Sequence, residues 1–447
     1  MGCDGNNATP PSPAIAPGAG EIDPRRVAEK LVSRFGEGGM DPRVRAVTPD
    51  FDAPFFQAGL AGYSDAAMRI IARRHGCPYC VTEALLDRTL LAGGRGFAKA
   101  DLGEIEDNIP GGDEDRPLAG QIMGSEPAEM AAAAIKMVEQ GARREKEYRA
   151  LAAGKATDGG ARGNRQWAMG KDPSPPAPSA PLPTAHCPLP TAPAFAAIDV
   201  NLACPVKKIA KKSRGGHWLT EPVGAIKILE AVREAVPADI AVTVKLRRAY
   251  DETDEMRENF LRIFDAAYDI GCAWVTVHGR TVTQKYIGPS RWDPIRDLVR
   301  RNPERVIFGS GDVWNVGEIF RMLDYAGVAG VSVARGCIGN PWIFRQARDI
   351  LAGREPQAPT IEQQRDVLLQ HFQLAMDVNR LWVRGEGEAR EQRAEQHTAR
   401  TMRKFAIKFA EHHPETLTVR RRFIACKTLD EWRAVLDEHY APEVPAS

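Results

Sequence analysis

The sequence predicts a (β/α)8 barrel, a closed ring of eight parallel strands with helices outside it, followed by a small C-terminal helical domain. Short apolar runs alternate with amphipathic stretches between residues 51 and 355, a pattern typical of strand–helix units in a parallel sheet. Eight such runs fit a barrel of ~250 residues. The glycine-rich dinucleotide fingerprint of a doubly wound sheet is absent from the sequence.

The predicted strands are short and rich in β-branched, aromatic and aliphatic residues. They are Ala53–Gln57, Tyr79–Thr82, Leu118–Ile122, Ala197–Leu202, Ala241–Leu246, Trp274–Val277, Val306–Gly309 and Gly330–Ala334. The stretches between them carry apolar residues at helical spacing, and most end near a Gly or a Pro. They predict helices at Asp65–His75, Pro127–Gly141, Pro222–Val236, Glu255–Gly271, Val316–Ala326 and Pro341–Leu351.

Two segments do not follow this rhythm. Residues 1–50 are rich in Gly, Pro, Ala and Asn, with at most one short amphipathic helix near Arg25–Phe35, and are predicted to be a flexible leader. Residues 143–194 pass through charged and Gly-rich stretches into a run dominated by Pro, Ala and Ser. They are predicted to be a disordered, low-complexity insertion within the barrel domain of residues 51–355.

Residues 356–447 are predicted to form the helical domain, because apolar residues recur there at three- and four-residue spacing. The predicted helices are Ile361–Arg380, Ala399–His412 and Thr428–His439. The charged stretch Arg384–Gln396 suits either a helix extension or a loop.

Composition restricts the class of protein. The 60 Lys and Arg residues balance 59 Asp and Glu residues, so overall charge does not indicate a nucleic-acid partner. No apolar stretch approaches the ~20 residues of a membrane-spanning helix, and no secretion signal is evident. Of the eight cysteines, Cys77 and Cys80 alone have metal or redox spacing, without the further ligands of a zinc site. We therefore expect reduced thiols, a cytoplasmic protein and no metal.

The stretch from Ile198 to Lys208 holds the strongest chemical signal. The apolar strand stops at Cys204, because Pro205 has no backbone N–H to continue the ladder. Positive charge then gathers within a few residues, which suits a polyanion and favours thiolate over thiol; it comes from Lys207, Lys208, Lys211, Lys212 and Arg214. A reactive cysteine beside a phosphate-binding patch is the hypothesis to test, although the lysines alone would equally suit a solvated face.

Polar and glycine residues also follow the other predicted strands, and barrel chemistry sits at the carboxyl ends of strands. Glycine-bearing turns after the seventh and eighth strands suit a phosphate. Lys245, the Gln121 amide and the His278 imidazole would surround a flat ring over the barrel mouth. The set suits flavin mononucleotide (FMN), with Lys245 stabilising the negative charge of the reduced ring.

Several spaced motifs resemble those of the tRNA-dihydrouridine synthase family. They are Asn201–Lys208, Val277–Thr281, Gly309–Asp312 and Ala334–Gly336 with Gly339–Trp342. The resemblance runs from about Ala53 to Phe344 and weakly into the helical tail. It implies an FMN-containing barrel that reduces uridine in tRNA to 5,6-dihydrouridine, with NADPH as electron source and tRNA as partner.

The resemblance also implies roles for individual residues. Cys204 would be the general acid that protonates C5 of the uracil after hydride reaches C6, and Asn201 would position the base. The expected FMN-binding residues are Gly59, Leu60, Ala61, Gln121, Lys245, His278, Ser310, Gly311, Asp312, Ala334 and Arg335. The expected tRNA contacts are Lys207, Lys208, Lys211, Arg280, Arg403 and Lys404.

The chain departs from the family pattern at a few of these positions. Gly59-Leu60-Ala61 stands for Pro-Met-Ala, Ser310 for Asn and Ala334 for Gly, while Phe405 replaces the imidazole of an Arg-Lys-His element in the tail. Two other hypotheses stay open at this point: an FMN-dependent barrel reductase of a free pyrimidine or other small molecule, and an RNA-binding protein that has lost chemistry. A monomer is the expected assembly.

Overall fold

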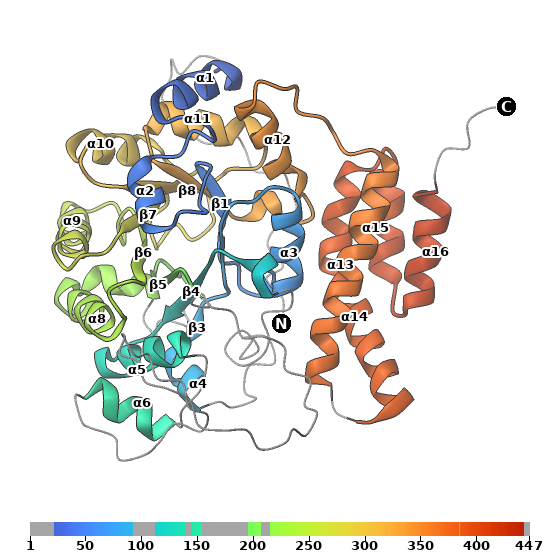
Figure 1. Cartoon of the computed structure of the whole chain (residues 1–447), viewed down its shortest axis with the longest axis horizontal. Coiled ribbons are helices and arrows are strands. Elements are labelled where there is room, and N and C mark those ends of the chain that lie inside the picture. Colours follow the sequence, from blue (N-terminus) through green and yellow to red (C-terminus); the bar gives the residue numbers. More distant parts are fainter. Residues whose placement is uncertain are drawn as a thin grey trace, which may run out of the picture.

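The computed structural model describes residues 22–92, 112–139, 145–153, 195–206, 215–383 and 385–441. Within them, nine parallel strands pair in one sheet, and a pairing between β2 and β4 closes eight of them into a barrel (Figure 1). The strands of the ring are β1 (Phe55–Gln57), β2 (Cys80–Val81), β4 (Leu118–Met123), β5 (Ala197–Leu202), β6 (Ala241–Arg247), β7 (Trp274–His278), β8 (Ile307–Ser310) and β9 (Gly330–Val333). The predicted fold class is confirmed. The ninth strand, β3 (Leu85–Leu86), pairs with β4 alone and was not predicted.

Strand alternation separates two layers of core. On β6, Val242, Val244 and Leu246 pack outward beneath the helices, whereas Thr243 and Lys245 line the barrel interior. Successive side chains of a strand point to opposite faces, so every second residue of each strand faces the interior. A residue that ends a strand on the inner face therefore reaches the mouth of the barrel.

The outer helices follow the predicted order with small shifts at their ends. They are α3 (Ala66–Arg74), α5 (Pro127–Val138), α8 (Pro222–Ala235), α9 (Asp254–Asp269), α10 (Asp293–Arg301), α11 (Val316–Ala326) and α12 (Trp342–Leu351). Local caps set several starts: Asp65 accepts from the Met68 amide, and Asn315 forms a capping box with Glu318. The helix α10 was not predicted, since in its highly charged sequence Ile295 and Leu298 are the buried residues.

The segment before β1 closes the far end of the barrel. It holds α1 (Pro24–Phe35) and α2 (Pro42–Val47). Met40, Val44 and Phe51 join the apolar cluster inside the barrel, and the Phe51 ring stacks on Tyr79 with centroids 4.6 Å apart. The predicted flexible leader lies outside the described residues as far as residue 21. The short helix predicted near Arg25–Phe35 is α1. The rest of the segment from Asp23 onward is not the flexible leader that was predicted, because α2 and the residues around it bury apolar side chains.

The predicted insertion also begins later than residue 143. Helix α6 (Glu145–Ala152) packs on α5 and buries Tyr148 completely, so it belongs to the outer layer of the barrel. Helix α4 (Asp87–Ala92) packs on α5 as well. Residues 154–194 lie outside the described residues.

The C-terminal domain is helical, as predicted, and stands beside the barrel next to α3 (Figure 1). Its helices are α13 (Ile361–Trp382), α14 (Gly387–Phe409), α15 (Thr416–Ala425) and α16 (Leu429–His439). The charged stretch Arg384–Gln396, which the sequence left as either a helix or a loop, lies largely in the first turns of α14. Helix α15 was not predicted. Among the described residues no helix is long and apolar enough to span a membrane.

The helical domain packs on loops at the mouth of the barrel. Lys404 of α14 donates a hydrogen bond to the carbonyl of Gly62, in the loop after β1. Its amine also lies 4.9 Å from the Tyr63 ring centroid. In the loop after β9, Gly339 touches α14 so closely that a side chain there would meet the backbone of Phe409 at 2.7 Å. The helical domain therefore flanks the opening of the barrel.

Candidate active site

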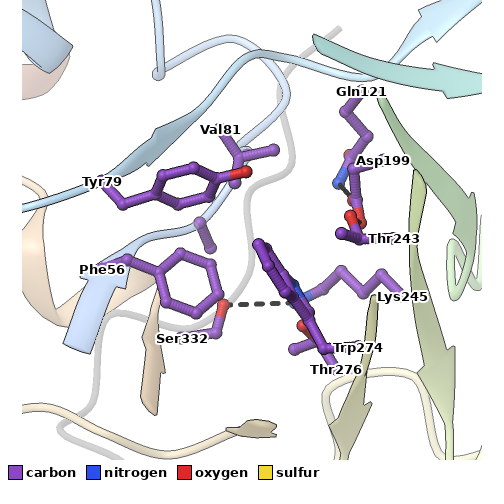
Figure 2. Close-up of a pocket in the computed structure, with 12 residues that line it drawn as sticks. Phe56, Tyr79, Val81, Gln121, Asp199, Thr243, Lys245, Trp274, Thr276 and Ser332 are labelled. Atoms are coloured by element: carbon purple, nitrogen blue, oxygen red, sulfur yellow. Dashed lines mark hydrogen bonds between the residues drawn. The ribbon is translucent and has the colours of Figure 1, made fainter. Parts of the chain in front are cut away.

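A pocket lies inside the barrel and changes from apolar to polar along its depth (Figure 2). Phe56, Tyr79 and Trp274 form its aromatic floor. The polar lining comes from neighbouring strands: Gln121 of β4, Asp199 of β5, Thr243 and Lys245 of β6, Thr276 of β7 and Ser332 of β9. Polar side chains from five strands thus converge toward the carboxyl ends of the barrel.

The loop after β1 brings backbone close to this pocket at Gly59. A Cβ atom on Gly59 would overlap the carbonyl oxygen of Thr82 and lie 3.2 Å from Gln121 Oε1. The Ser64 hydroxyl accepts a hydrogen bond from the Leu60 amide at 2.8 Å, and Glu83 accepts one from the Gly62 amide at 2.7 Å. These bonds fix a loop in which Gly59 must lack a side chain. Leu60 is half-buried and Ala61 is exposed.

A chain of hydrogen bonds crosses the polar layer. Thr243 Oγ1 donates to Asp199 Oδ1 at 2.6 Å, and Gln121 Nε2 donates to Asp199 Oδ2 at 2.7 Å. Asn201 Nδ2 donates to Gln121 Oε1 at 2.7 Å, and the Ala203 amide donates to Asn201 Oδ1 at 2.9 Å. The chain links three strands to the residue that precedes Cys204.

Lys245 is the cation of the pocket. Its Nζ lies 3.5 Å from Ser310 Oγ and 3.5 Å from Ser332 Oγ, of which Figure 2 shows the second. Burial lowers the pKa of Lys245 to about 8, and the negative charge of Asp199 opposes that shift. The sequence predicts an anionic cofactor as the partner of Lys245. In the structure the Asp199 carboxylate also interacts with the charge of this lysine.

His278 stands at the end of β7 beside the Gly311 turn. Its Nδ1 lies 3.5 Å from Ser310 Oγ, and its Nε2 is buried without a hydrogen-bond partner. Burial, reinforced by nearby cations such as Arg247 and Lys245, holds the pKa of His278 well below its usual range. The imidazole is therefore neutral near pH 7 and keeps one nitrogen available.

Asp312 and Arg280 bind one another at this turn. Arg280 Nη2 lies 2.8 Å and 2.6 Å from the two carboxylate oxygens of Asp312. The Ser290 amide donates to Asp312 Oδ2 at 2.7 Å, and Arg335 Nη2 lies 3.5 Å from Oδ1. Asp312 adopts a positive φ of 53° and is buried. Its oxygens thus anchor the surrounding loops, a role that sequence did not predict.

Arg280 is 1% exposed, so the prediction that it contacts tRNA directly was wrong: it also donates to the Gly288 carbonyl and forms part of the wall of the site. Arg335 differs, since its side chain is 39% exposed. Its guanidinium lies 4.5 Å from the Trp314 ring centroid. Ala334, the residue before it, follows β9 and begins the short turn that carries Arg335.

Cys204 lies partly exposed in the loop after β5. Its carbonyl accepts a hydrogen bond from the Gly216 amide at 2.9 Å, and Arg247 Nε donates to the Ala203 carbonyl at 3.0 Å. Burial raises the pKa of the Cys204 thiol, while the Arg247 charge lowers it. The net direction favours the protonated thiol, contrary to the thiolate expected from the neighbouring lysines. Lys207, Lys208 and Lys211 lie outside the described residues.

The two tail residues predicted to contact tRNA lie in different surroundings. Lys404 is occupied between the domains, because it bonds Gly62 and lies between the rings of Tyr63 and Phe405. Its contact with tRNA, like that of Arg403, stays a prediction. Arg403 is partly exposed and donates to the Ile424 carbonyl at 3.3 Å.

Sequence reasoning missed Asp199, Thr243, Ser332 and Arg247 as residues of the site. Strand alternation was the available signal, because Asp199 shares a strand face with Asn201, and Thr243 and Arg247 share one with Lys245. Among the described residues, no group of three or more His, Cys, Asp or Glu side chains is arranged to hold a metal ion.

Comparison with known proteins gives a consistent result. A family model described as "Dihydrouridine synthase (Dus)" matches residues 179–442. The "Probable tRNA-dihydrouridine synthase" of Rickettsia conorii is 34% identical over 181 residues, 40% of this chain and 53% of that protein. The protein of the same description from Treponema pallidum is 39% identical over 172 residues, 37% of this chain and 50% of its own. The "tRNA-dihydrouridine synthase B" of Shewanella oneidensis is 34% identical over 182 residues, 40% and 55% of the two chains. The chain thus spans about half the length of these curated relatives.

Proposed function

Because the chain belongs to the dihydrouridine synthase family, we propose that it is a flavin-dependent oxidoreductase that reduces uridine in tRNA to 5,6-dihydrouridine. The observation that carries the proposal is the position of Cys204. A thiol whose pKa is raised by burial follows the carboxyl end of β5, and Asp199 of the same strand lines a pocket with a cation and several polar groups. A protonated thiol at a barrel mouth suits a proton donor.

The residues of the mouth fit FMN. Gly59 lets the backbone after β1 lie against the Thr82 carbonyl, which any side chain there would overlap, and Lys245 supplies a cation to the same pocket. Three buried polar atoms without partners belong to residues around the Gly311 turn: His278 Nε2, Ser290 Oγ and Arg280 Nη1. Such atoms call for a polar ligand.

The residues that would hold FMN are divided between ring and phosphate. Gly59, Leu60, Ala61, Gln121, Lys245 and His278 would line the ring, and Ser310, Gly311, Ala334 and Arg335 the phosphate end. Asp312 would act indirectly, by holding Arg280 and Arg335 in place. FMN held by these residues and reduced by NADPH would supply the hydride for C6 of the uracil.

The protein's own residues complete the reduction with a proton. Asn201 would orient the uracil, and the Cys204 thiol would give its proton to C5, so that one hydride and one proton saturate the C5–C6 bond. The thiolate that remains lies near the Arg247 guanidinium, whose charge favours it, and it regains a proton from water. The neutral state of His278 avoids a second positive charge beside the ring.

The substrate base must leave the stacked RNA to reach this pocket, at a cost of a few kcal/mol. The helical domain flanks the mouth and is the surface proposed to hold tRNA meanwhile. Arg403 and the lysines 207, 208 and 211 are the proposed phosphate contacts. The free thiols of the six described cysteines support the cytoplasm as the place of action.

The test is a reaction with purified protein, FMN, NADPH and tRNA that lacks dihydrouridine, followed by mass spectrometry of the modified base. Cys204→Ala is expected to keep bound flavin but to lower the rate of dihydrouridine formation by about 100-fold or more. Cys272→Ala, at a buried cysteine of the outer core, is the control and is expected to stay active. Undiminished tRNA reduction by Cys204→Ala would refute the proton-donor role, and reduction of free uridine alone would point to a small-molecule reductase.

A further inference from the structure

The hydrogen-bond chain that runs through the site ends at Asp199, whose carboxylate only accepts hydrogen bonds. Both of its carboxylate oxygens receive a hydrogen bond, from Thr243 Oγ1 at 2.6 Å and from Gln121 Nε2 at 2.7 Å. The residue is 5% exposed, and Figure 2 shows it between Gln121 and Thr243 on the wall of the pocket. Burial raises the pKa of Asp199, while the hydrogen bonds from Thr243 and Gln121 and the charge of Lys245 oppose that shift. In its ionised form the carboxylate has no proton to donate, so each neighbour must present a donor to it.

Asp199 sets the direction of the bonds from this end of the chain, in agreement with the donor-only Ala203 amide at the other end. Gln121 must turn its NH2 group toward Asp199, which leaves Oε1 to face Asn201. Asn201 must then present Nδ2 to Gln121 and Oδ1 to the Ala203 amide. The backbone amide at the far end is a donor only. The chain is therefore consistent in one orientation of both side-chain amides and in no other.

The far end of this chain is the turn that carries Cys204. Ala203 is held on two sides, by Asn201 at its amide and by Arg247 at its carbonyl, 3.0 Å away. Its neighbour is the proposed proton donor. If the Gln121 amide were reversed, its Nε2 would face Asn201 Nδ2, and two donors would meet. The hydrogen bond through which Asn201 fixes the Ala203 amide would then be disturbed.

We infer that Asp199 is a positioning residue of the site: together with the Ala203 amide it fixes the orientation of the Gln121 and Asn201 amides, and it thereby supports the turn that presents Cys204. The inference rests on the proposed function for its consequence in catalysis, but the chain itself is a property of the folded protein. Asp199 acts through Gln121 and Asn201 and transfers no proton itself.

An exchange of partners tests the direction of the chain. Gln121→Glu puts a second carboxylate against Asp199, so the two groups repel one another unless they take up a proton. The double variant Asp199→Asn, Gln121→Glu restores the pattern with the two groups exchanged. The new amide at position 199 would accept from Thr243 and donate to the new carboxylate at position 121, whose other oxygen would accept from Asn201. Asp199→Asn alone keeps the shape but removes the acceptor-only end, so only the Ala203 amide still fixes the orientation of the amides at positions 201 and 121.

The first measurement is the melting temperature of each variant without tRNA. Gln121→Glu is expected to lower it by about 5 °C, because a buried charge is left without a partner. The double variant is expected to regain most of that loss. A double variant no more stable than Gln121→Glu would overturn the inference, whatever the protein does to tRNA.

The second measurement is steady-state kinetics on tRNA, per bound flavin. Asp199→Asn is expected to lower kcat by about 10-fold while KM for tRNA changes by less than about 2-fold, because a misplaced turn affects the reaction more than binding. The double variant is expected to exceed Gln121→Glu in kcat by about 10-fold. Equal kcat for wild type and Asp199→Asn would overturn the positioning role.

Asp41→Asn is the matched control, since Asp41 is a buried carboxylate that pairs with Arg43 beside α2, at the closed end of the barrel. It is expected to lower the melting temperature and to leave kcat unchanged. A loss of kcat in this control equal to that of Asp199→Asn would also overturn the inference, by showing that any buried charge has the same effect. A wild-type protein that leaves tRNA unreduced refutes the proposed function, and the melting temperatures then decide the inference by themselves.

Discussion

Arg247 donates a hydrogen bond from Nε to the carbonyl of Ala203, 3.0 Å away, and so holds the backbone immediately before Cys204. The same guanidinium bonds the carbonyls of Thr281 and Lys285, each at 2.7 Å, and thereby ties the loop after β7 to the loop after β5. Burial lowers the pKa of Arg247 to about 10, so it keeps its charge near neutral pH. One buried cation thus supports the geometry of the thiol and lowers the thiol pKa.

The first prediction concerns pH. A proton donor must be protonated, so kcat for tRNA reduction is expected to fall as pH rises through the pKa of Cys204, which burial places above its ordinary value. Arg247→Gln removes the charge that lowers this pKa, so its alkaline limb should move to higher pH while kcat drops by about 10-fold or more. Arg247→Lys keeps the charge and should keep the position of the limb. If kcat of wild type and of Arg247→Gln fell at the same alkaline pH, the assignment of Cys204 as the titrating proton donor would be contradicted.

The second prediction concerns Gly59. The substitution Gly59→Ala places a methyl group against the Thr82 carbonyl and close to Gln121, so the loop must shift. We expect the affinity for FMN to fall by about 10-fold or more, measured by quenching of flavin fluorescence on titration with apoprotein. Gly317→Ala, in α11 and away from the pocket, should bind FMN as wild type does. Unchanged affinity in Gly59→Ala would exclude a close approach of ligand at this loop.

The third prediction follows from Lys245. Its pKa of about 8 lies below that of an exposed lysine because burial disfavours the ammonium form. An anionic ligand binds the protonated form better, so FMN affinity should decrease as pH rises through about 8, and binding above that pH should take up a proton. Titrations at about pH 7 and about pH 9 measure the difference. In Lys245→Met the affinity for FMN should be lower and should not depend on pH in this range. A decrease of equal size in that variant would assign the pH dependence to another group.

The fourth prediction separates Lys404 from Arg403. Lys404→Met removes the hydrogen bond to Gly62 and the contact with the Tyr63 ring, and should destabilise the protein by about 1–2 kcal/mol in denaturant unfolding. Its tRNA affinity should keep the salt dependence of wild type. Arg403→Ala should leave stability nearly unchanged and reduce the slope of log affinity against log salt by about 1. The reverse result would return Lys404 to the tRNA-binding surface.

The sequence by itself determined the repeating architecture, because hydrophobic periodicity depends on local geometry. Strand β5 (Ala197–Leu202) and helix α11 (Val316–Ala326) have the predicted bounds. Residues where apolar runs stop, such as Gln121 and Lys245, also proved to line one pocket. Closure of a parallel barrel brings all strand ends to one mouth, so counting strands was enough to gather them.

Only the tertiary structure decided which charges are free and which are already paired. Three charged residues look in sequence like ligand contacts but have partners far away in the chain. Arg280 pairs with Asp312, and Lys404 bonds the Gly62 carbonyl. Asp199 looks like an exception in an apolar strand, yet it receives two hydrogen bonds across the barrel. The protonation of Cys204 depends in the same way on burial and on Arg247. Partner choice and desolvation arise from contacts between distant segments, and a local pattern carries no information about them.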